Sequence, residues 1–311
     1  MAAGIESVDF ARWPADPDGF QRAFGTSFER YGFAVVRNHG LPHDLVDRCL
    51  AHFRQFFSWP VAARMRYHVP GSGGARGYTP FGVETAKGAT EHDLKEFWHV
   101  GRELPSGHRY ARFMPDNLWV ADIPGFREDV LALWESFDAL GRELLAAIAL
   151  YLGLPARWFD DKVGEGNSVL RVIHYPPVPD GAPGVRAGAH EDINVITLLL
   201  GAEEAGLQLR DHDGRWLDVN PEAGTVVCNV GDMLQRLTNH RLPSTTHRVV
   251  NPPPERAGVA RYSLPFFLHF NPDFEIRSLP ACTGPDRPDR YPQPITADDY
   301  LQQRLREIRL L

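Results

Sequence analysis

The sequence predicts an α+β fold in which helices flank a double-stranded β-helix, or jelly-roll, core. The first half of the chain carries long amphipathic helical patterns, whereas residues 168–270 carry short β-branched and aromatic runs separated by Gly, Pro, Asn and Asp. These short runs follow one another without long helical patterns between them. They therefore favour a sandwich or jelly-roll barrel over a parallel sheet.

The first 155 residues are expected to form a mainly helical scaffold with lid loops. Asp16 followed by Pro17 is typical of a helix start, and Gly32 is typical of a helix end. Residues 70–123 are rich in Gly and Pro and predict irregular covering loops. The regular elements expected in this part are helices at 16–31, 42–58 and 124–153 and strands at 33–37 and 96–100.

Residues 156–285 are expected to form the jelly-roll core. The predicted strands are 168–175, 192–200, 206–210, 214–219, 224–230, 246–250 and 260–270. Gly231 and Asp232 predict a turn between strands, with the Asp232 carboxylate bonding to backbone amides. The remaining segment, 286–311, is expected to end in a helix at about 296–310 that packs on the outside.

One oxygenase-sized domain, 1–311, is the simplest organisation of the chain. Its 311 residues are 43% hydrophobic and 23% charged, which is the composition of a globular protein with a large core. No Ser/Gly-rich or charged linker separates two halves. The three cysteines, Cys49, Cys228 and Cys282, are far apart and have no metal-ligand spacing, so buried thiols are expected.

Charge and hydropathy exclude several classes of partner. The formal net charge is −7, and the basic cluster near 304–309 is interrupted by apolar residues, so nucleic acid is not an expected partner. The most apolar stretch, 144–154, is shorter than the roughly 20 residues that cross a bilayer. The N-terminus shows no secretory pattern, and a cytoplasmic location is expected. The sequence does not indicate an oligomeric state.

A metal site is predicted around His190 and Asp192. On an extended chain these two side chains project from the same face, and Glu191 projects from the other. The predicted strand at 246–250 supplies a second imidazole, His247. Two imidazoles and one carboxylate on one side of an ion leave open positions, as in non-haem Fe(II) oxygenases and unlike a closed structural zinc site. A His-x-Asp triplet alone arises often by chance.

A second motif, Arg261-x-Ser263, supports the interpretation of the His-x-Asp triplet as part of a metal site. Both side chains share one face of the predicted strand at 260–270. A guanidinium beside a hydroxyl suits the carboxylate of a small dicarboxylic acid, because the planar fork donates two charge-assisted hydrogen bonds. The alternative is an arginine that pairs with a structural carboxylate at the edge of the barrel.

Together these motifs resemble the isopenicillin N synthase-like branch of the 2-oxoglutarate/Fe(II)-dependent dioxygenases. The matching segments, in the order the family has them, are RYGFAVVRNHGLP (30–42), HEDINVITLLL (190–200), GLQLRDHDGRWLDVNPEAGTVVCNVGDMLQRLTN (206–239), STTHRVV (244–250) and RYSLPFF (261–267). The resemblance covers most of the chain.

The resemblance implies both the cofactors and the roles of single residues. Fe(II) would be held by His190, Asp192 and His247, with O₂ and 2-oxoglutarate as co-substrates. Arg261 and Ser263 would hold the distal carboxylate of 2-oxoglutarate, and the Tyr175 hydroxyl falls where many members contact the same molecule. Plant members usually carry Asn two residues before that tyrosine, whereas this chain has Ile173, which puts the contacts of that strand in doubt.

The reaction implied by the resemblance is oxidation of a small-molecule substrate, with hydroxylation as the default and release of succinate and CO₂. One alternative is an isopenicillin N synthase-like iron oxidase that uses no 2-oxoglutarate, since Arg-x-Ser there holds the substrate carboxylate. Another is a non-catalytic metal-binding jelly-roll protein. The segment 76–84, together with 93–97, gives an indication of the substrate, because it resembles bacterial members of the family that are related to the ethylene-forming enzyme.

An amino acid or related polar metabolite is the substrate class that this second resemblance implies. Some of those bacterial members act on arginine-like amino acids. Glu84 would then meet a cationic group of the substrate, and Arg171 would meet a carboxylate. The alternative is that both charges face water, as loop charges commonly do.

Overall fold

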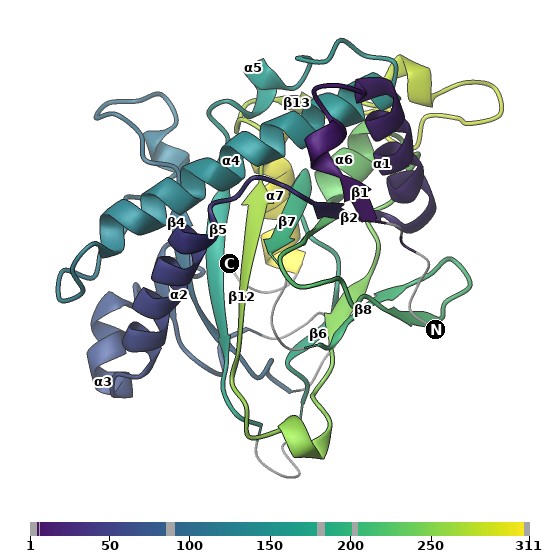
Figure 1. Ribbon diagram of the computed structural model, residues 1–311. Coiled ribbons are helices and arrows are strands. Elements are labelled where there is room, and N and C mark those ends of the chain that lie inside the picture. Colours follow the sequence, from purple (N-terminus) through teal and green to yellow (C-terminus); the bar gives the residue numbers. More distant parts are fainter. Residues whose placement is uncertain (1–4, 6, 85–90, 179–183, 201–204, 308–311) are drawn as a thin grey trace.

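Two mainly antiparallel sheets and a layer of helices make up the computed structural model of the protein (Figure 1). The structure describes residues 5, 7–84, 91–178, 184–200 and 205–307. The predicted jelly-roll core with flanking helices is confirmed. Within the described residues, no helix combines the length and apolar character that crossing a membrane would require.

The larger sheet has eight strands in the order β1-β2-β10-β7-β12-β5-β4-β3. Four of them come from the first third of the chain, so the helical scaffold and the core share this sheet. Its strands are β1 (Ser7–Asp9), β2 (Phe33–Arg37), β3 (Gly77–Thr79), β4 (Glu96–Gly101), β5 (Val169–Tyr175), β7 (Ile196–Leu200), β10 (Val226–Val230) and β12 (Arg261–Leu268).

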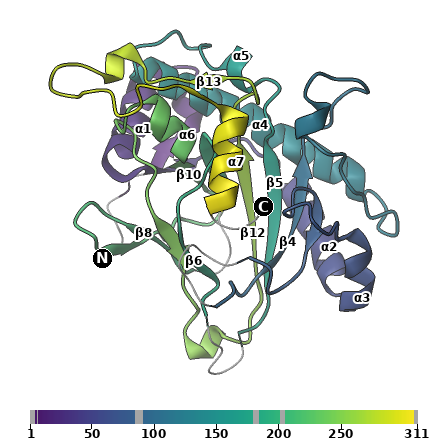
Figure 2. The ribbon, with the colours of Figure 1, turned by 180° about the vertical axis from the view of Figure 1, so that it is seen from behind.

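The smaller sheet has four strands in the order β6-β11-β8-β9, and Figure 2 shows β6 and β8 to one side of β12 and β5 of the larger sheet. Its strands are β6 (Ala187–His190), β8 (Leu207–Arg210), β9 (Trp216–Asp218) and β11 (His247–Val249). A two-stranded ribbon, β13 (Glu275–Ile276) with β14 (Ile295–Thr296), leads into the last helix. The division of the chain at residues 155 and 285 stays a prediction.

The helices lie mainly on the outer face of the larger sheet, where α1, α2 and α4 pack side by side (Figure 1). The helices are α1 (Pro17–Tyr31), α2 (His43–Phe57), α3 (Val61–Arg64), α4 (Phe126–Tyr151), α5 (Asp160–Val163), α6 (Asp232–Leu237) and α7 (Ala297–Glu307).

Local sequence signals explain where α1 begins and ends. The Asp16 side chain accepts a hydrogen bond from the Gly19 amide, 2.9 Å away, and Pro17 occupies the first helical position, where no amide hydrogen is needed. Gly32 ends the helix with a φ of 67°, a left-handed conformation that glycine adopts without steric cost. The chain then enters β2 at Phe33, as predicted.

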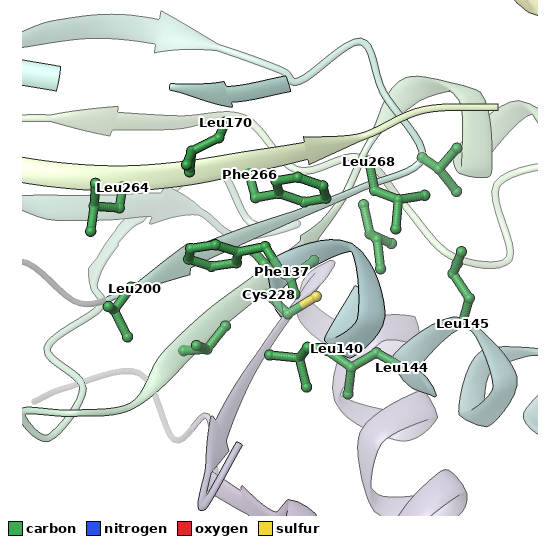
Figure 3. Packing of buried hydrophobic residues seen from close by; sticks show 14 of the residues in the cluster. Phe137, Leu140, Leu144, Leu145, Leu170, Leu200, Cys228, Leu264, Phe266 and Leu268 are labelled. Carbon is green, nitrogen blue, oxygen red and sulfur yellow. The ribbon is translucent and has the colours of Figure 1, made fainter. Parts of the chain in front are cut away.

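The outer face of the larger sheet is apolar and packs against α4. Figure 3 shows leucines and phenylalanines from β5, β7 and β12 meeting those of the helix. Phe137 of α4 stacks on Phe266 of β12 with ring centroids 5.6 Å apart. Both rings are fully buried. This contact fixes the sheet beneath the longest helix.

The inner face of the larger sheet turns toward the smaller sheet. Because strand side chains alternate, the neighbours of the outward residues on β4, β5 and β12 point inward. A second apolar cluster forms there from Phe33, Val35, Phe97, Ile173, Tyr175, Ala187, Leu207, Leu209, Val219, Val227 and Val249. The space between the sheets also receives polar side chains of the same strands.

Three local expectations were wrong. The strand predicted at 192–200 begins only at Ile196, because residues 191–195 form an irregular loop after β6. Asp232 does not sit in a turn between strands but begins α6, and its carboxylate pairs with Arg304 at 3.1 Å. The Gly-rich segment after residue 70 contains one unexpected strand, β3.

We expect Phe137→Ala to lower the free energy of unfolding by about 3–5 kcal/mol, because it removes a buried ring and leaves a cavity against Phe266. Denaturant titration followed by circular dichroism measures the change. Phe81→Ala is the matched control, since Phe81 is 48% exposed and its loss should change stability by less than about 0.5 kcal/mol. Equal losses in the two variants would contradict this account of the core.

Candidate metal centre and adjoining cavity

Two histidines face each other across neighbouring strands of the smaller sheet. His190 ends β6 and His247 begins β11, and the two residues are direct partners in the antiparallel register. Side chains at such positions lie next to each other on one face of the sheet. Their rings are accordingly close, with centroids 4.4 Å apart.

Asp192 completes the group from the loop that follows β6. Its Oδ1 lies 3.8 Å from the Nε2 atom of His190 and 3.8 Å from the Nε2 atom of His247. Among the described residues, these three form the group whose ligand atoms all lie within 4.8 Å of one another. The convergence predicted for them is present, although Asp192 reaches it from a loop and not from a strand.

Hydrogen bonds orient both imidazoles. The Nδ1 atom of His190 lies 2.8 Å from the Gly188 carbonyl oxygen, and that of His247 lies 3.1 Å from the Thr245 carbonyl oxygen. A carbonyl only accepts, so each Nδ1 carries the proton and each Nε2 keeps a free electron pair. Burial, with the neighbouring His247, lowers the pKa of His190 to about 4, which keeps this ring neutral.

The other oxygen of Asp192 is held by the larger sheet. Its Oδ2 accepts hydrogen bonds from the Thr197 hydroxyl at 2.5 Å and from the Asn229 amide at 2.8 Å. Burial opposes ionisation of Asp192, but the histidines and these two donors outweigh it and lower the pKa of the carboxyl group. Asp192 therefore presents a charged, oriented Oδ1 to the point where the Nε2 atoms meet.

The donor set fits an iron(II) ion. Two neutral imidazole nitrogens and one carboxylate oxygen, each oriented by a hydrogen bond on its far side, are the ligands of the facial-triad iron sites. No thiol takes part, since Cys49, Cys228 and Cys282 are all buried elsewhere. The pKa values of Cys49 and Cys228 are raised by burial.

A cavity of about 440 Å³ adjoins two of the three residues, His190 and Asp192. His190 and Asp192 line it together with side chains from β4, β5, β12 and α7. Glu84 and Arg171, singled out from the sequence, are both in its wall. They meet each other at 3.3 Å, so neither charge faces water freely.

Lys95 and His99 extend this pair into a cluster that the sequence did not indicate. The Lys95 ammonium group lies 2.6 Å from Glu84 and 2.8 Å from Asp93. The Nε atom of Arg171 donates to the Nε2 atom of His99 at 2.5 Å. Burial opposes ionisation of Glu84, but Arg171 and Lys95 outweigh it and hold its pKa well below the usual range. The charges of this cluster are thus satisfied within the protein.

Arg261, Ser263 and Tyr175 lie on the inner faces of β12 and β5. Arg261 is the register partner of Tyr175, and its guanidinium carbon lies 4.9 Å from the centre of the tyrosine ring. Ser263 shares the strand face of Arg261, and all three side chains are buried. Lys95 interacts electrostatically with both Tyr175 and His190.

The last helix, which was predicted to pack on the outside, also contributes to the wall of the cavity. Leu301, Arg304 and Leu305 of α7 line the cavity wall. Figure 2 shows α7, in yellow, in front of the strands of the core. Arg304 pairs with Asp232, whose backbone amide donates to the Asp192 carbonyl at 2.7 Å. Residues beyond 307 lie outside the described part of the chain.

Comparisons with known proteins agree with this geometry. A profile of the 2OG-Fe(II) oxygenase superfamily matches residues 166–270. A second profile, for the N-terminal region of non-haem dioxygenases in morphine synthesis, matches residues 5–122. The first match spans the jelly-roll strands with all three candidate ligands, and the second spans much of the scaffold.

Similar proteins come from fungi and bacteria. The chain is 34% identical to the 2-oxoglutarate-Fe(II) type oxidoreductase hxnY of Emericella nidulans, over 89% of this chain and 81% of that protein. A crystal structure of a 2OG-Fe(II) oxygenase family protein from Caulobacter crescentus is 56% identical, with a TM-score of 0.93 over 99% and 100% of the two chains. A full-length Neurospora crassa protein, crystallised in complex with alpha-KG, is 30% identical, with a TM-score of 0.85 over 97% and 96%.

We expect Thr197→Val to weaken metal binding by about 10-fold to 100-fold, because Asp192 loses the hydroxyl that orients its carboxylate. Titration with Mn(II), a redox-stable substitute for Fe(II), followed by electron paramagnetic resonance measures the dissociation constant. Thr225→Val makes the same chemical change at another buried threonine, whose hydroxyl bonds to the Glu222 carbonyl at 2.7 Å. If both variants bind Mn(II) like the parent, the Thr197 hydroxyl does not support the site.

Proposed function

This chain belongs to the 2-oxoglutarate/Fe(II)-dependent oxygenase superfamily, and on that premise we propose that His190, Asp192 and His247 are the residues that hold its iron. The enzyme oxidises a small-molecule substrate and converts 2-oxoglutarate and O₂ into succinate and CO₂. The observation that supports the ligand assignment is the meeting of two Nε2 atoms and one carboxylate oxygen beside a cavity.

Each proposed ligand has a separate task. When bound, Fe(II) supplies open coordination positions and the redox chemistry of the oxidation. His190 and His247 offer electron pairs that their carbonyl partners keep free of protons. Asp192 offers the negative charge, which its two donors hold in one direction.

Arg261, Ser263 and Tyr175 are the residues we propose for the distal carboxylate of 2-oxoglutarate. A buried guanidinium beside a hydroxyl binds a carboxylate through two parallel hydrogen bonds and excludes water from it. The register that places Arg261 opposite Tyr175 supports a shared ligand. Ile173 faces Ser263 in the same register and offers an apolar contact where plant members usually have asparagine.

The relatives favour 2-oxoglutarate over the alternative oxidase that does without it. The similar fungal proteins are named 2-oxoglutarate-dependent oxidoreductases and dioxygenases, and two similar solved structures contain alpha-KG or 2OG. A non-catalytic metal-binding role has no such support. For this chain, hydroxylation of the substrate is the proposed outcome.

An amino acid or related polar metabolite is the substrate class we propose. One relative, 32% identical, is named a proline hydroxylase, and one crystal structure of the Neurospora crassa protein contains thymine. Arg171 is the residue we propose to contact such a substrate, since it lines the cavity, where its guanidinium carbon lies 4.1 Å from the centre of the Phe97 ring and 5.2 Å from that of Phe267. Glu84 is the proposed partner of a cationic group.

The use of 2-oxoglutarate is tested on Fe(II)-loaded protein without oxygen. Addition of 2-oxoglutarate should produce a weak visible charge-transfer band, and admission of O₂ should release succinate.

Arg261→Met should weaken 2-oxoglutarate binding about 10-fold to 100-fold while Mn(II) binding persists, since a hydrogen-bonded charge pair is lost. Arg210→Met, at an exposed arginine of β8 outside the cavity wall, is the control and should change neither the 2-oxoglutarate affinity nor Mn(II) binding. Unchanged 2-oxoglutarate affinity in Arg261→Met would reject its role.

The substrate class is tested by adding free amino acids and recording the stimulation of succinate release. We expect a response to a cationic amino acid, with L-arginine and L-lysine as probes, and loss of most of that response in Glu84→Gln. Glu103→Gln, an exposed acid paired with Arg127, is the matched control. A panel in which no cationic amino acid stimulates the parent enzyme would count against the role given to Glu84.

A further inference from the structure

Arg76 is a buried cation in the wall of the cavity beside the candidate metal centre. Its side chain is only 3% exposed, and it lines the same cavity as His190 and Asp192. Its two hydrogen bonds go to neutral acceptors, the Ala75 carbonyl oxygen at 2.7 Å and the Asn167 side-chain oxygen at 3.0 Å. They use two of the five N–H donors of the guanidinium.

No carboxylate of the described residues pairs with Arg76. The other cations of the cavity wall each have one, since Lys95 and Arg171 meet Glu84, and Arg304 meets Asp232. Burial lowers the pKa of Arg76 to about 10, so the group stays charged at neutral pH. A buried charge without a counter-charge is costly, and such a cost is commonly kept where a ligand supplies the missing charge.

The fold makes room for this guanidinium. A Cβ atom at Gly101, the last residue of β4, would lie 2.0 Å from the Arg76 Cζ, so only glycine lets the guanidinium lie against the strand. The Arg76 Nε atom is buried without a hydrogen-bond partner among the described atoms. The neighbouring His99 and His269, which line the same cavity, have pKa values lowered by burial, and the pKa of His269 falls to about 4. Among the described residues of this wall, Arg76 is then the uncompensated positive charge.

We propose that Arg76 binds a carboxylate group of the substrate and thereby restricts this enzyme to small carboxylic acids. The proposal rests on the function given above and narrows its substrate class. Terminal N–H groups of the planar fork match the two oxygens of a carboxylate, which a point-like cation would not. Arg171 and Glu84 then contact the remainder of the molecule.

The test compares acids with their amides on Mn(II)-loaded protein saturated with 2-oxoglutarate, so that the Arg261 region is already filled. The probes are acetate, benzoate and L-proline against acetamide, benzamide and L-prolinamide, at equal ionic strength. Thermal unfolding and ligand-observed NMR report binding. We expect at least one acid to bind the parent about 10-fold to 100-fold more tightly than its amide. Arg76→Met should reduce that ratio to about one.

Arg64→Met is the matched control, because Arg64 is also a buried arginine but is paired with the Glu96 carboxylate. Its loss leaves a buried anion, so Arg64→Met should lower the melting temperature. Arg76→Met should leave it unchanged or higher. Arg76→Lys keeps the positive charge but lacks the planar guanidinium group, so it should retain part of the preference for acids. This variant provides a second measurement of the role of Arg76 if Arg76→Met folds poorly.

Two results would overturn the proposal. One is equal binding of every acid and its amide by a parent protein that still binds and consumes 2-oxoglutarate. The other is a preference for acids that survives in Arg76→Met. Failure of the proposed function would give a different result from either of these, because neither the charge-transfer band nor succinate would then appear.

Discussion

The alternation of side chains along the larger sheet is the constraint on which the rest of the structure depends. One face of β5 and β12 must be apolar because α4 covers it, as the contact of Phe137 with Phe266 shows. The opposite face is then free to carry Arg171, Tyr175, Arg261 and other polar groups toward the smaller sheet. The helical layer and the polar cavity are therefore two results of one period-two pattern.

The sequence predicted those parts of the fold that depend on local signals. The cap at Asp16, the end at Gly32 and most strands follow from residues that act on their neighbours in the chain. The convergence of the three candidate ligands was also predictable, because a short motif contributes two of them and the strand near 247 supplies the third. The path of residues 191–195 could not be predicted, since the loop is held by distant contacts such as the hydrogen bond from the Asp232 amide.

The charged wall of the cavity could not be predicted for the same reason. Arg76 meets Asn167, and Arg171 meets Glu84, across long stretches of chain that only the folded sheet brings together. The helix α7 shows the difficulty most clearly. Its amphipathic pattern indicates a buried side, but the pattern does not say that this side faces a cavity beside Asp192.

The three candidate ligands belong to different parts of the barrel. His190 and His247 stand on the smaller sheet, whereas Asp192 is tied through Thr197 and Asn229 to β7 and β10 of the larger one. An ion held by all three would therefore connect the smaller sheet to the larger one. Since such an ion binds only the folded chain, its affinity adds to the stability of the closed barrel. Loss of metal would thus loosen the walls of the cavity as well as stop the chemistry.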